Sequence, residues 1–433
     1  MITAADMAIA APVAPAAPAG PRFAAASATS FRERILLIVL FVTVLMSSIA
    51  FIEPSPHDAL MGLLLMACLI AGVRFDRLLA VPFLLLLVWN VAGMLSLMNV
   101  PTEEKAIQYA GTSVYLAVAA LTFACLFAHN TMPRLATMRV AYVLTATVIS
   151  LAGIAGYLSL FPHAHELFAT YDRALGAFKD PNVFGPFLIW PALIVIERMT
   201  ARHLHLKDIV VLGILLVGLL LSFSRGAWFH FAVSCAVTLV LNFLAAPTPA
   251  QRMRIFVISA IGVAALAAFI VILLSFESIR RMFLERAQLI QYYDVGEGGR
   301  FELQRLALSV VLNFFNGMGP FEFARVYGLQ QHNVYLQAFI VYGWIGGIAY
   351  IMLLFATLWV ALRTVFVRTP WQPYLITALA AFIGEVLEGF VIDTDHWRHF
   401  FLLLGMIWGL AAATLNQRRT AAMPYGVAHV GAV

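Results

Sequence analysis

Long apolar runs separated by short polar connections extend over most of the chain. A membrane-spanning helix needs about 20 consecutive, mostly apolar residues, and twelve runs reach this length, some only with their flanks. The pattern therefore predicts an all-α polytopic membrane protein with about 12 transmembrane helices. The second, sixth and seventh runs are short, so the sequence leaves their ends open. The runs cover residues 35–52, 59–73, 78–98, 107–128, 140–161, 183–197, 209–223, 226–244, 255–276, 334–362, 374–392 and 399–415.

One long polar segment, residues 277–333, interrupts this pattern before the tenth run. Residues 278–293 and 300–315 each have apolar positions at helical spacing, so two amphipathic helices are predicted. The glycine-rich stretch Asp294-Val-Gly-Glu-Gly-Gly299 separates them. Lying on the membrane surface, the two helices would form a lid over the bundle mouth. The predicted division begins with a disordered tail at 1–30 and nine transmembrane helices within 31–276. The loop at 277–333, three more transmembrane helices within 334–415 and a second tail at 416–433 follow.

Composition supports the membrane assignment. Hydrophobic residues make up 62% and charged residues 11% of the chain, whereas soluble domains carry about 25% charged residues. The net charge of +5 is scattered between apolar runs, so no nucleic-acid partner is expected. All three cysteines lie inside apolar runs without metal-ligand spacing. The first thirty residues are rich in Ala and Pro, and the apolar run after Arg34 is long enough to span, so no signal peptide is predicted.

Basic residues are distributed unequally between alternate connections. Cytoplasmic connections are enriched in Lys and Arg, and one set holds sixteen of the 27 basic residues. That set includes both tails, so we expect both termini in the cytoplasm and an outward-facing loop at 277–333, which would be periplasmic in a Gram-negative cell. The sixteen are Arg22, Arg32, Arg34, Arg74, Arg77, Arg134, Arg139, Arg198, Arg202, Lys207, Arg252, Arg254, Arg363, Arg368, Arg418 and Arg419.

The outward loop nevertheless carries six arginines. Either long loops cross the membrane regardless of charge, or some of these arginines bind an anion at the membrane surface. Arg280, Arg281 and Arg286, with Arg305, are expected to be mostly solvated. The six are Arg280, Arg281, Arg286, Arg300, Arg305 and Arg325.

Two arginines are the best candidates for binding phosphate. Arg225 lies in Phe223-Ser-Arg-Gly-Ala-Trp228, a turn between two apolar runs that places it at the depth of lipid phosphates. A guanidinium pairs bidentately with phosphate oxygens and keeps its charge; the alternative is an arginine that reaches lipid headgroups beside Trp228. Arg300 opens the second loop helix after Gly298-Gly299, and helix N-termini favour anions. Its alternative is an exposed charge that solvates the lid.

His332 is the candidate general base. It enters the tenth run, and Gly343, eleven residues later, falls about 20° round the same helix face if the helix includes both. Gly343 and Gly347 would let this helix pack closely. An imidazole can take a proton from a hydroxyl near neutral pH. The alternative is a hydrogen-bonded structural histidine.

Other polar residues are weaker candidates. Asp180-Pro-Asn182 either caps the sixth helix or contacts a sugar. Glu385 and Glu388 lie inside the eleventh run, where a carboxylate is expensive and a functional role is the default. Asp393-Thr-Asp395 has the spacing of some metal-dependent transferases, but it is too short to be specific. No metal and no cofactor are predicted. The supporting candidates are Arg305, Arg325, Asp180, Asn182, Glu388 and Arg398.

Together these segments resemble the O-antigen ligase and polymerase superfamily of bacterial surface-polysaccharide assembly. The resemblance rests on residues 180–401, and the twelve runs with one large outer loop before the tenth match a GT-C-like layout. The motifs that carry it are Phe223-Ser-Arg-Gly-Ala-Trp228, Gly299-Arg300, Asn316-Gly-Met-Gly-Pro320 and His332-Asn-Val-Tyr-Leu336 through Gly343, with Asp180-Pro-Asn-Val-Phe-Gly185 and Trp397-Arg-His-Phe-Phe401.

The resemblance implies transfer of an oligosaccharide from undecaprenyl diphosphate at the outer face of the inner membrane. Arg225 and Arg300 would then hold the diphosphate, and His332 would act at the acceptor hydroxyl. Fixed guanidinium groups can stabilise the leaving diphosphate without a metal. Direct displacement would invert the anomeric centre. The implied partners are the lipid-linked donor, a glycan or lipid A core acceptor, the bilayer and a chain-length regulator.

Four functions remain open from the sequence. A polymerase joins repeat units on the lipid carrier, whereas a ligase moves the finished glycan to lipid A core; Asp180-Pro-Asn182 favours the polymerase. A transporter or flippase of lipid-linked glycan is the third, since Gly72-Val-Arg-Phe-Asp-Arg77 faintly resembles a transporter loop. Alternating access would lead one to expect a cytoplasmic counterpart of the arginine cluster, and none is evident. A non-catalytic scaffold is a further alternative.

Overall fold

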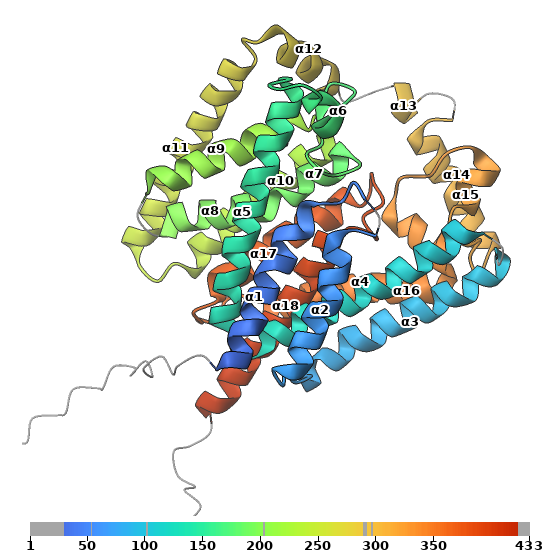
Figure 1. The fold of residues 1–433 in the computed structure, drawn as a ribbon, viewed down its shortest axis with the longest axis horizontal. Coiled ribbons are helices and arrows are strands. Elements are labelled where there is room, and N and C mark those ends of the chain that lie inside the picture. The colour runs from blue at the N-terminus through green and yellow to red at the C-terminus, as the bar shows by residue number, and fades with distance from the viewer. Residues whose placement is uncertain are drawn as a thin grey trace, which may run out of the picture.

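A computed structural model describes residues 30–422 except 53, 101–102, 202–203, 289–291 and 296–297. The described chain is mostly helical (Figure 1). Its described strands are two antiparallel dipeptides, β1 (Ala169–Thr170) and β2 (Arg173–Ala174). The predicted all-α fold of a polytopic membrane protein is confirmed.

The helices fall into an N-terminal, a middle and a C-terminal set. The first set is α1 (Phe31–Leu45), α2 (Pro56–Ile70), α3 (Ala80–Ser96), α4 (Glu104–Ala128), α5 (Thr131–Tyr157) and α6 (Ala164–Phe168), with short 3-10 turns at Met46–Ser48, Arg77–Leu79 and Leu97–Asn99. The second is α7 (Pro181–Phe187), α8 (Ile189–Ala201), α9 (Leu206–Leu221), α10 (Arg225–Ala245) and α11 (Pro249–Leu273). The third is α12 (Glu277–Arg286), α13 (Tyr292–Val295), α14 (Arg300–Asn313), α15 (Glu322–Tyr327), α16 (Val334–Thr364), α17 (Gln372–Glu388) and α18 (Arg398–Ala422).

Each of the twelve apolar runs contains a helix. Eight helical segments in the described chain are long and apolar enough to cross a membrane. The other four runs correspond to shorter helices, α1, α2, α9 and α17, of 15 to 17 residues. The sixth run, which looks short in the sequence, belongs to a 21-residue segment, Pro181–Ala201, that combines α7 and α8. In the loop, α14 begins at Arg300 as the sequence predicts, whereas α12 ends at Arg286, before the predicted end at 293.

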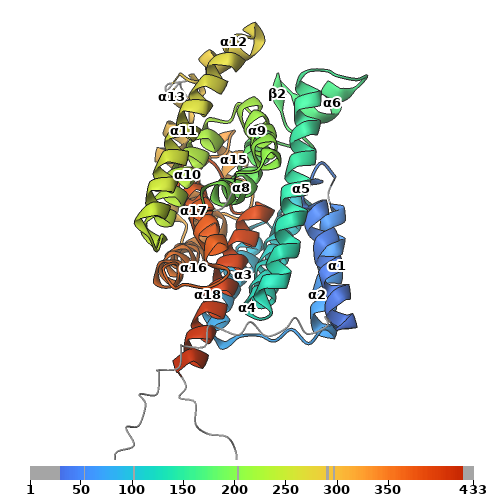
Figure 2. The ribbon, with the colours of Figure 1, turned by 90° about the vertical axis from the view of Figure 1, so that its left-hand side faces the viewer.

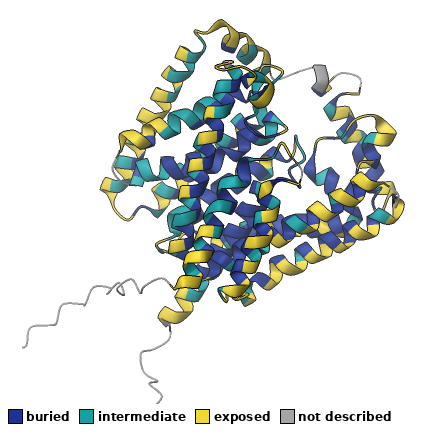
Figure 3. Cartoon of the chain, viewed as in Figure 1, coloured by how far each residue is buried: buried dark blue, intermediate teal, exposed yellow. Residues whose placement is uncertain are grey.

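Burial distinguishes a central helix from a peripheral one. In the apolar 18-residue stretch of α18, 89% of the residues are buried, whereas in the corresponding stretch of α11 only 6% of the residues are buried (Figure 3). Helix α18 packs along α4, and a Cβ added at Gly405 or Gly409 would lie within 2.6 Å of the α4 backbone, so these glycines permit the close contact. Large exposed apolar side chains such as Phe256 and Ile261 cover α11, as expected of a surface that faces lipid.

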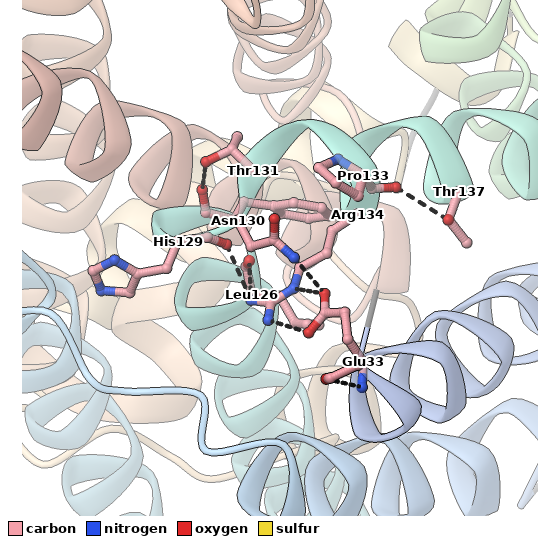
Figure 4. Close-up of polar contacts among 10 residues, drawn as sticks. Glu33, Leu126, His129, Asn130, Thr131, Pro133, Arg134 and Thr137 are labelled. Atoms are coloured by element: carbon pink, nitrogen blue, oxygen red, sulfur yellow. Dashed lines mark hydrogen bonds and ion pairs between the residues drawn. The ribbon is translucent and has the colours of Figure 1, made fainter. Parts of the chain in front are cut away.

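The start of α1 and the end of α18 lie at one end of the bundle, and α6 and α12 lie at the other (Figure 2). At the first end, Arg134 joins α5 to α1 and α4 (Figure 4). Its Nε and Nη2 donate to the two carboxylate oxygens of Glu33, both at 2.9 Å, and its Nη1 donates to the carbonyl of Leu126. The Arg134 side chain is 6% exposed, and its satisfied bidentate pair fixes the start of α1.

The turn at Asn316-Gly-Met-Gly-Pro320 packs into a kink in α16. Gly343 has φ 66° and ψ −174° inside the helix. The kink frees backbone groups there, so that Trp344 N donates to Phe315 O at 2.9 Å and Met318 N donates to Ile340 O at 2.6 Å. A Cβ on Gly343 would lie 2.7 Å from Phe315 O. Gly343 therefore serves as a kink that docks the loop, rather than as part of the predicted small-residue packing face.

Replacing Gly343 by alanine should destabilise the protein by about 2–4 kcal/mol, because the backbone conformation is accessible mainly to glycine and the added methyl group meets the loop. Thermal unfolding in detergent measures this, with Gly262→Ala on α11 as the control. Gly262 has open space around its Cβ position, so its variant should unfold like the wild type. Equal unfolding temperatures for all three proteins would show that the kink is not required.

Candidate active site

The turn between α9 and α10 holds Arg225 in place. Phe223 has φ 46°, in the left-handed region, and the Ser224 side chain caps α10 by accepting from Ala227 N. The indole of Trp228 donates to Leu219 O at 3.2 Å. Arg225 is thus the first residue of α10, and its side chain extends from a rigid corner.

Asp294 brings the two predicted phosphate-binding arginines together. Arg225 Nη2 lies 2.6 Å from Asp294 Oδ2, and Arg300 Nη1 lies 3.5 Å from Asp294 Oδ1. The Asp294 side chain is 5% exposed. Because α13 supplies the carboxylate and α14 begins at Arg300, the loop closes over the corner that carries Arg225. In the sequence, Asp294 appears only as a residue that ends a helix.

Four arginines line one pocket, here called the arginine pocket, with a volume of about 150 Å³. Arg173 is held there because its Nε donates to Ser222 O and its Nη2 donates to Asn182 Oδ1, both at 2.8 Å. Arg173 and Arg286 are not among the predicted site residues. For Arg173, the signal that could have found it is its place in a short outward connection, a class of connection that holds few basic residues; for Arg286, it is membership of the arginine-rich loop 277–333. The pocket is lined by Arg173, Asn182, Phe223, Ser224, Arg225, Gly226, Arg286, Arg300, Glu388, Val391 and Ile392.

His332 lies beside this pocket and pairs with a carboxylate. Its Nδ1 is 3.6 Å from Asp393 Oδ2, and Ile392, the residue before Asp393, lines the arginine pocket. The His332 side chain is 46% exposed. Gln304, one turn after Arg300 on α14, donates to His332 O at 3.2 Å. The same helix therefore contacts His332 and supplies Arg300.

The backbone at His332 is not helical. Its φ is 49°, in the left-handed region, and Asn333 caps α16 by accepting from Tyr335 N and Leu336 N. The expectation that His332 shares a helix face with Gly343 is therefore wrong, because helical spacing does not extend to a residue before the cap. The left-handed backbone directs His332 away from the helix, a conformation that histidine adopts more readily than most residues.

The environment of Asp393 affects its protonation. Burial raises the pKa of the Asp393 carboxyl above its ordinary value, and the contact with His332 opposes part of this rise. The sequence presents Asp393 only as part of a nonspecific Asp-x-Asp pattern. In the structure its Oδ2 lies 3.6 Å from Nδ1 of the candidate base, close enough to pair with a protonated imidazole.

The remaining candidates fall into three places. Asn182 and Glu388 line the arginine pocket. Asp180 caps α7 by accepting from Asn182 N at 2.8 Å, and Arg398 pairs with Asp58 on α2 through Nε and Nη2. Two others lie elsewhere: Arg325 pairs with Glu322 within α15, and Arg305 is exposed and does not line the pocket.

The two carboxylates of α17 meet histidines from other helices. His230 Nδ1 is 2.8 Å from Glu388 Oε2, and its Nε2 is 2.9 Å from Ala381 O. Since a carbonyl only accepts, Nε2 carries a hydrogen, and one further proton is shared between Nδ1 and Glu388. Glu385 lies 3.3 Å from His399 Nε2.

Among the residues with described positions, no three His, Cys, Asp or Glu side chains are gathered as a metal site requires. The arginine pocket offers guanidinium groups held by protein contacts, near a histidine that lies 3.6 Å from a carboxylate. Such groups can hold a diphosphate and stabilise the charge that develops on it as a bond to it breaks.

Comparison with protein families agrees with this arrangement. Residues 210–351 match the family model described as O-antigen ligase. This region is similar to the O-antigen ligase family. It contains Arg225, Asp294, Arg300 and His332, so the family domain supplies the main polar groups of the site. The match supports membership of the O-antigen ligase and polymerase superfamily, and with it an enzyme of the glycosyltransferase type. No curated protein matches the chain.

Proposed function

We propose that this protein polymerises surface-polysaccharide repeat units, using an undecaprenyl-diphosphate-linked oligosaccharide as donor. The observation that carries the proposal is the convergence of Arg225 and Arg300 on one buried carboxylate, beside the His332–Asp393 pair. The membrane helices give access to a polyprenyl carrier, and the family match supports glycosyl transfer. The active end would face the periplasm, with the termini in the cytoplasm of the inner-membrane protein.

The arginine pocket would hold the diphosphate of the donor. Asp294 marks the place where a negatively charged group satisfies both guanidinium groups, and phosphate oxygens fit the same donors. Arg173 and Arg286 add positive charge around that place. As the sugar–oxygen bond breaks, its electrons pass to the diphosphate, and the guanidinium groups stabilise this charge.

His332 would remove the proton from the acceptor hydroxyl. With Nδ1 turned toward Asp393, Nε2 is the nitrogen available to the hydroxyl. The acceptor oxygen then bonds to the anomeric carbon as the diphosphate leaves from the opposite side, so the configuration inverts. The hydroxyl proton ends on His332.

The Asp393→Asn variant should lower kcat about 10- to 100-fold, because the amide no longer orients and stabilises the protonated imidazole. Burial raises the pKa of Asp393, so wild-type transfer should fall as the pH drops through that pKa and the carboxyl takes up a proton. The variant lacks this titration. A pH–rate profile of both proteins measures the effect, and matching profiles at equal rates would remove Asp393 from the mechanism.

A ligase that transfers the glycan to lipid A core is the second candidate, because the matched family carries that description. Deleting the gene in its host and separating the surface glycans on a gel distinguishes the two. Single repeats left on the lipid core support the polymerase, whereas long chains left on the carrier support the ligase. A normal ladder of surface glycans would contradict both.

A further inference from the structure

A second cavity of about 150 Å³ lies next to the arginine pocket, and the proposed reaction steps do not use it. We call it the aromatic cavity. Rings line it together with charged and polar side chains, a combination typical of sites for small polar ligands. Its main lining residues are His57, Tyr115, Phe178, Asp180, Trp397 and Arg398.

Two short segments separate the cavity from the arginine pocket. In the first turn of α7, Asp180 lines the aromatic cavity and Asn182 lines the arginine pocket. After α17, Ile392 lines the arginine pocket and Trp397 lines the aromatic cavity. The two spaces therefore border the same two segments of the chain.

The polar groups of the cavity are fixed by contacts outside it. His57 Nδ1 is 2.9 Å from the carbonyl of Thr43 and so must donate to it, which leaves Nε2 as an acceptor. His57 is 4% exposed and lines the cavity. Arg398 donates to both carboxylate oxygens of Asp58. Asp180 Oδ1 accepts from Asn182 N at the start of α7, and Asp180 Oδ2 takes no part in that hydrogen bond. The cavity thus presents both donors and acceptors in set positions.

These features suit a sugar ring better than a phosphate or an acyl chain. Arg398 gives both its Nε and its Nη2 to the carboxylate of Asp58, so this one arginine and its carboxylate balance in charge, whereas in the arginine pocket Arg225 and Arg300 share a single carboxylate. An acyl chain would leave the buried His57 acceptor without a hydrogen bond. A pyranose has C–H faces that pack on aromatic rings and hydroxyl groups that both donate and accept. We propose that the aromatic cavity binds a pyranose ring of the substrate glycan, an inference that rests on the proposed function.

Two variants test this without removing a buried hydrogen bond. Ala50 lines the cavity and is half-buried, so Ala50→Leu fills space that a ring would occupy. Asp180→Asn keeps an oxygen for the α7 cap and removes the charge. The control is Ala152→Leu, a half-buried position on α5 that lines neither space. Binding of undecaprenyl diphosphate is compared with binding of the same lipid carrying the host's oligosaccharide repeat.

If the ring belongs to the donor, the affinity advantage of the glycan-bearing lipid should fall about 10-fold in Ala50→Leu and about 3-fold in Asp180→Asn, from lost or weakened hydrogen bonds. Binding of the bare lipid should not change. If the ring belongs to the acceptor, the advantage should persist while the KM for acceptor rises by similar factors. Wild-type values for both quantities in both variants would overturn the proposal. A wild-type protein that binds neither lipid would instead contradict the proposed function.

Discussion

The Arg225→Ala variant is expected to lose about 100- to 1000-fold in kcat/KM for glycosyl transfer. This is the usual cost of removing one fixed group that stabilises a developing negative charge. Arg225 is held by the α9–α10 turn and by Asp294, so no neighbouring arginine can take its place without moving the loop. Arg225→Lys should recover part of the rate, because lysine restores the positive charge but cannot form the bidentate hydrogen bonds of a guanidinium.

Arg305→Ala is the matched control for this prediction. Arg305 lies on the same loop, five residues after Arg300, but it is exposed and does not line the pocket. Its variant should transfer at close to the wild-type rate. Equal losses for Arg225→Ala and Arg305→Ala would mean that the loop attracts the substrate through its total charge, and that the pocket has no specific role.

The second large effect is expected for His332→Ala, which should lower kcat about 100- to 10,000-fold through loss of the general base. The affinity for undecaprenyl diphosphate should remain near the wild-type value, because the arginine pocket is complete without the imidazole. Single-turnover transfer and lipid binding, measured on the same preparation, separate the two effects.

His163→Ala provides the control for His332→Ala. His163 also has a left-handed backbone and a carboxylate partner, Glu166, but its side chain is 74% exposed on the α6 segment. Its loss should leave transfer unchanged. If His332→Ala kept the wild-type rate while it bound the lipid normally, another group would have to accept the proton.

The apolar pattern predicts the helices because backbone in a membrane must satisfy its own hydrogen bonds, so every long apolar run becomes a helix. It predicts helix ends less well. Residues 286–300 contain Arg286, Asp294 and Arg300, three charged residues that fold back toward the bundle rather than continue one amphipathic helix. Long-range contacts decide that arrangement, and local spacing does not contain them.

The candidate site likewise contains some residues that the sequence predicts and others that it does not. Arg225, Arg300 and His332 stand out in the sequence because each is a polar group at a membrane boundary. Asp294 and Asp393 do not, because their importance comes from partners 69 and 61 residues away. Arg173 is missed for a similar reason: its partner Asn182 is close in sequence, but the pocket that they line includes α10, α14 and α17.

The most direct test of the account is single-turnover transfer by the purified protein in bilayers that contain the lipid-linked oligosaccharide donor. The wild type should join one repeat to another and release undecaprenyl diphosphate. Arg225→Ala should bind the donor weakly, whereas His332→Ala should bind it normally and transfer almost nothing. Full transfer by both variants would contradict the account.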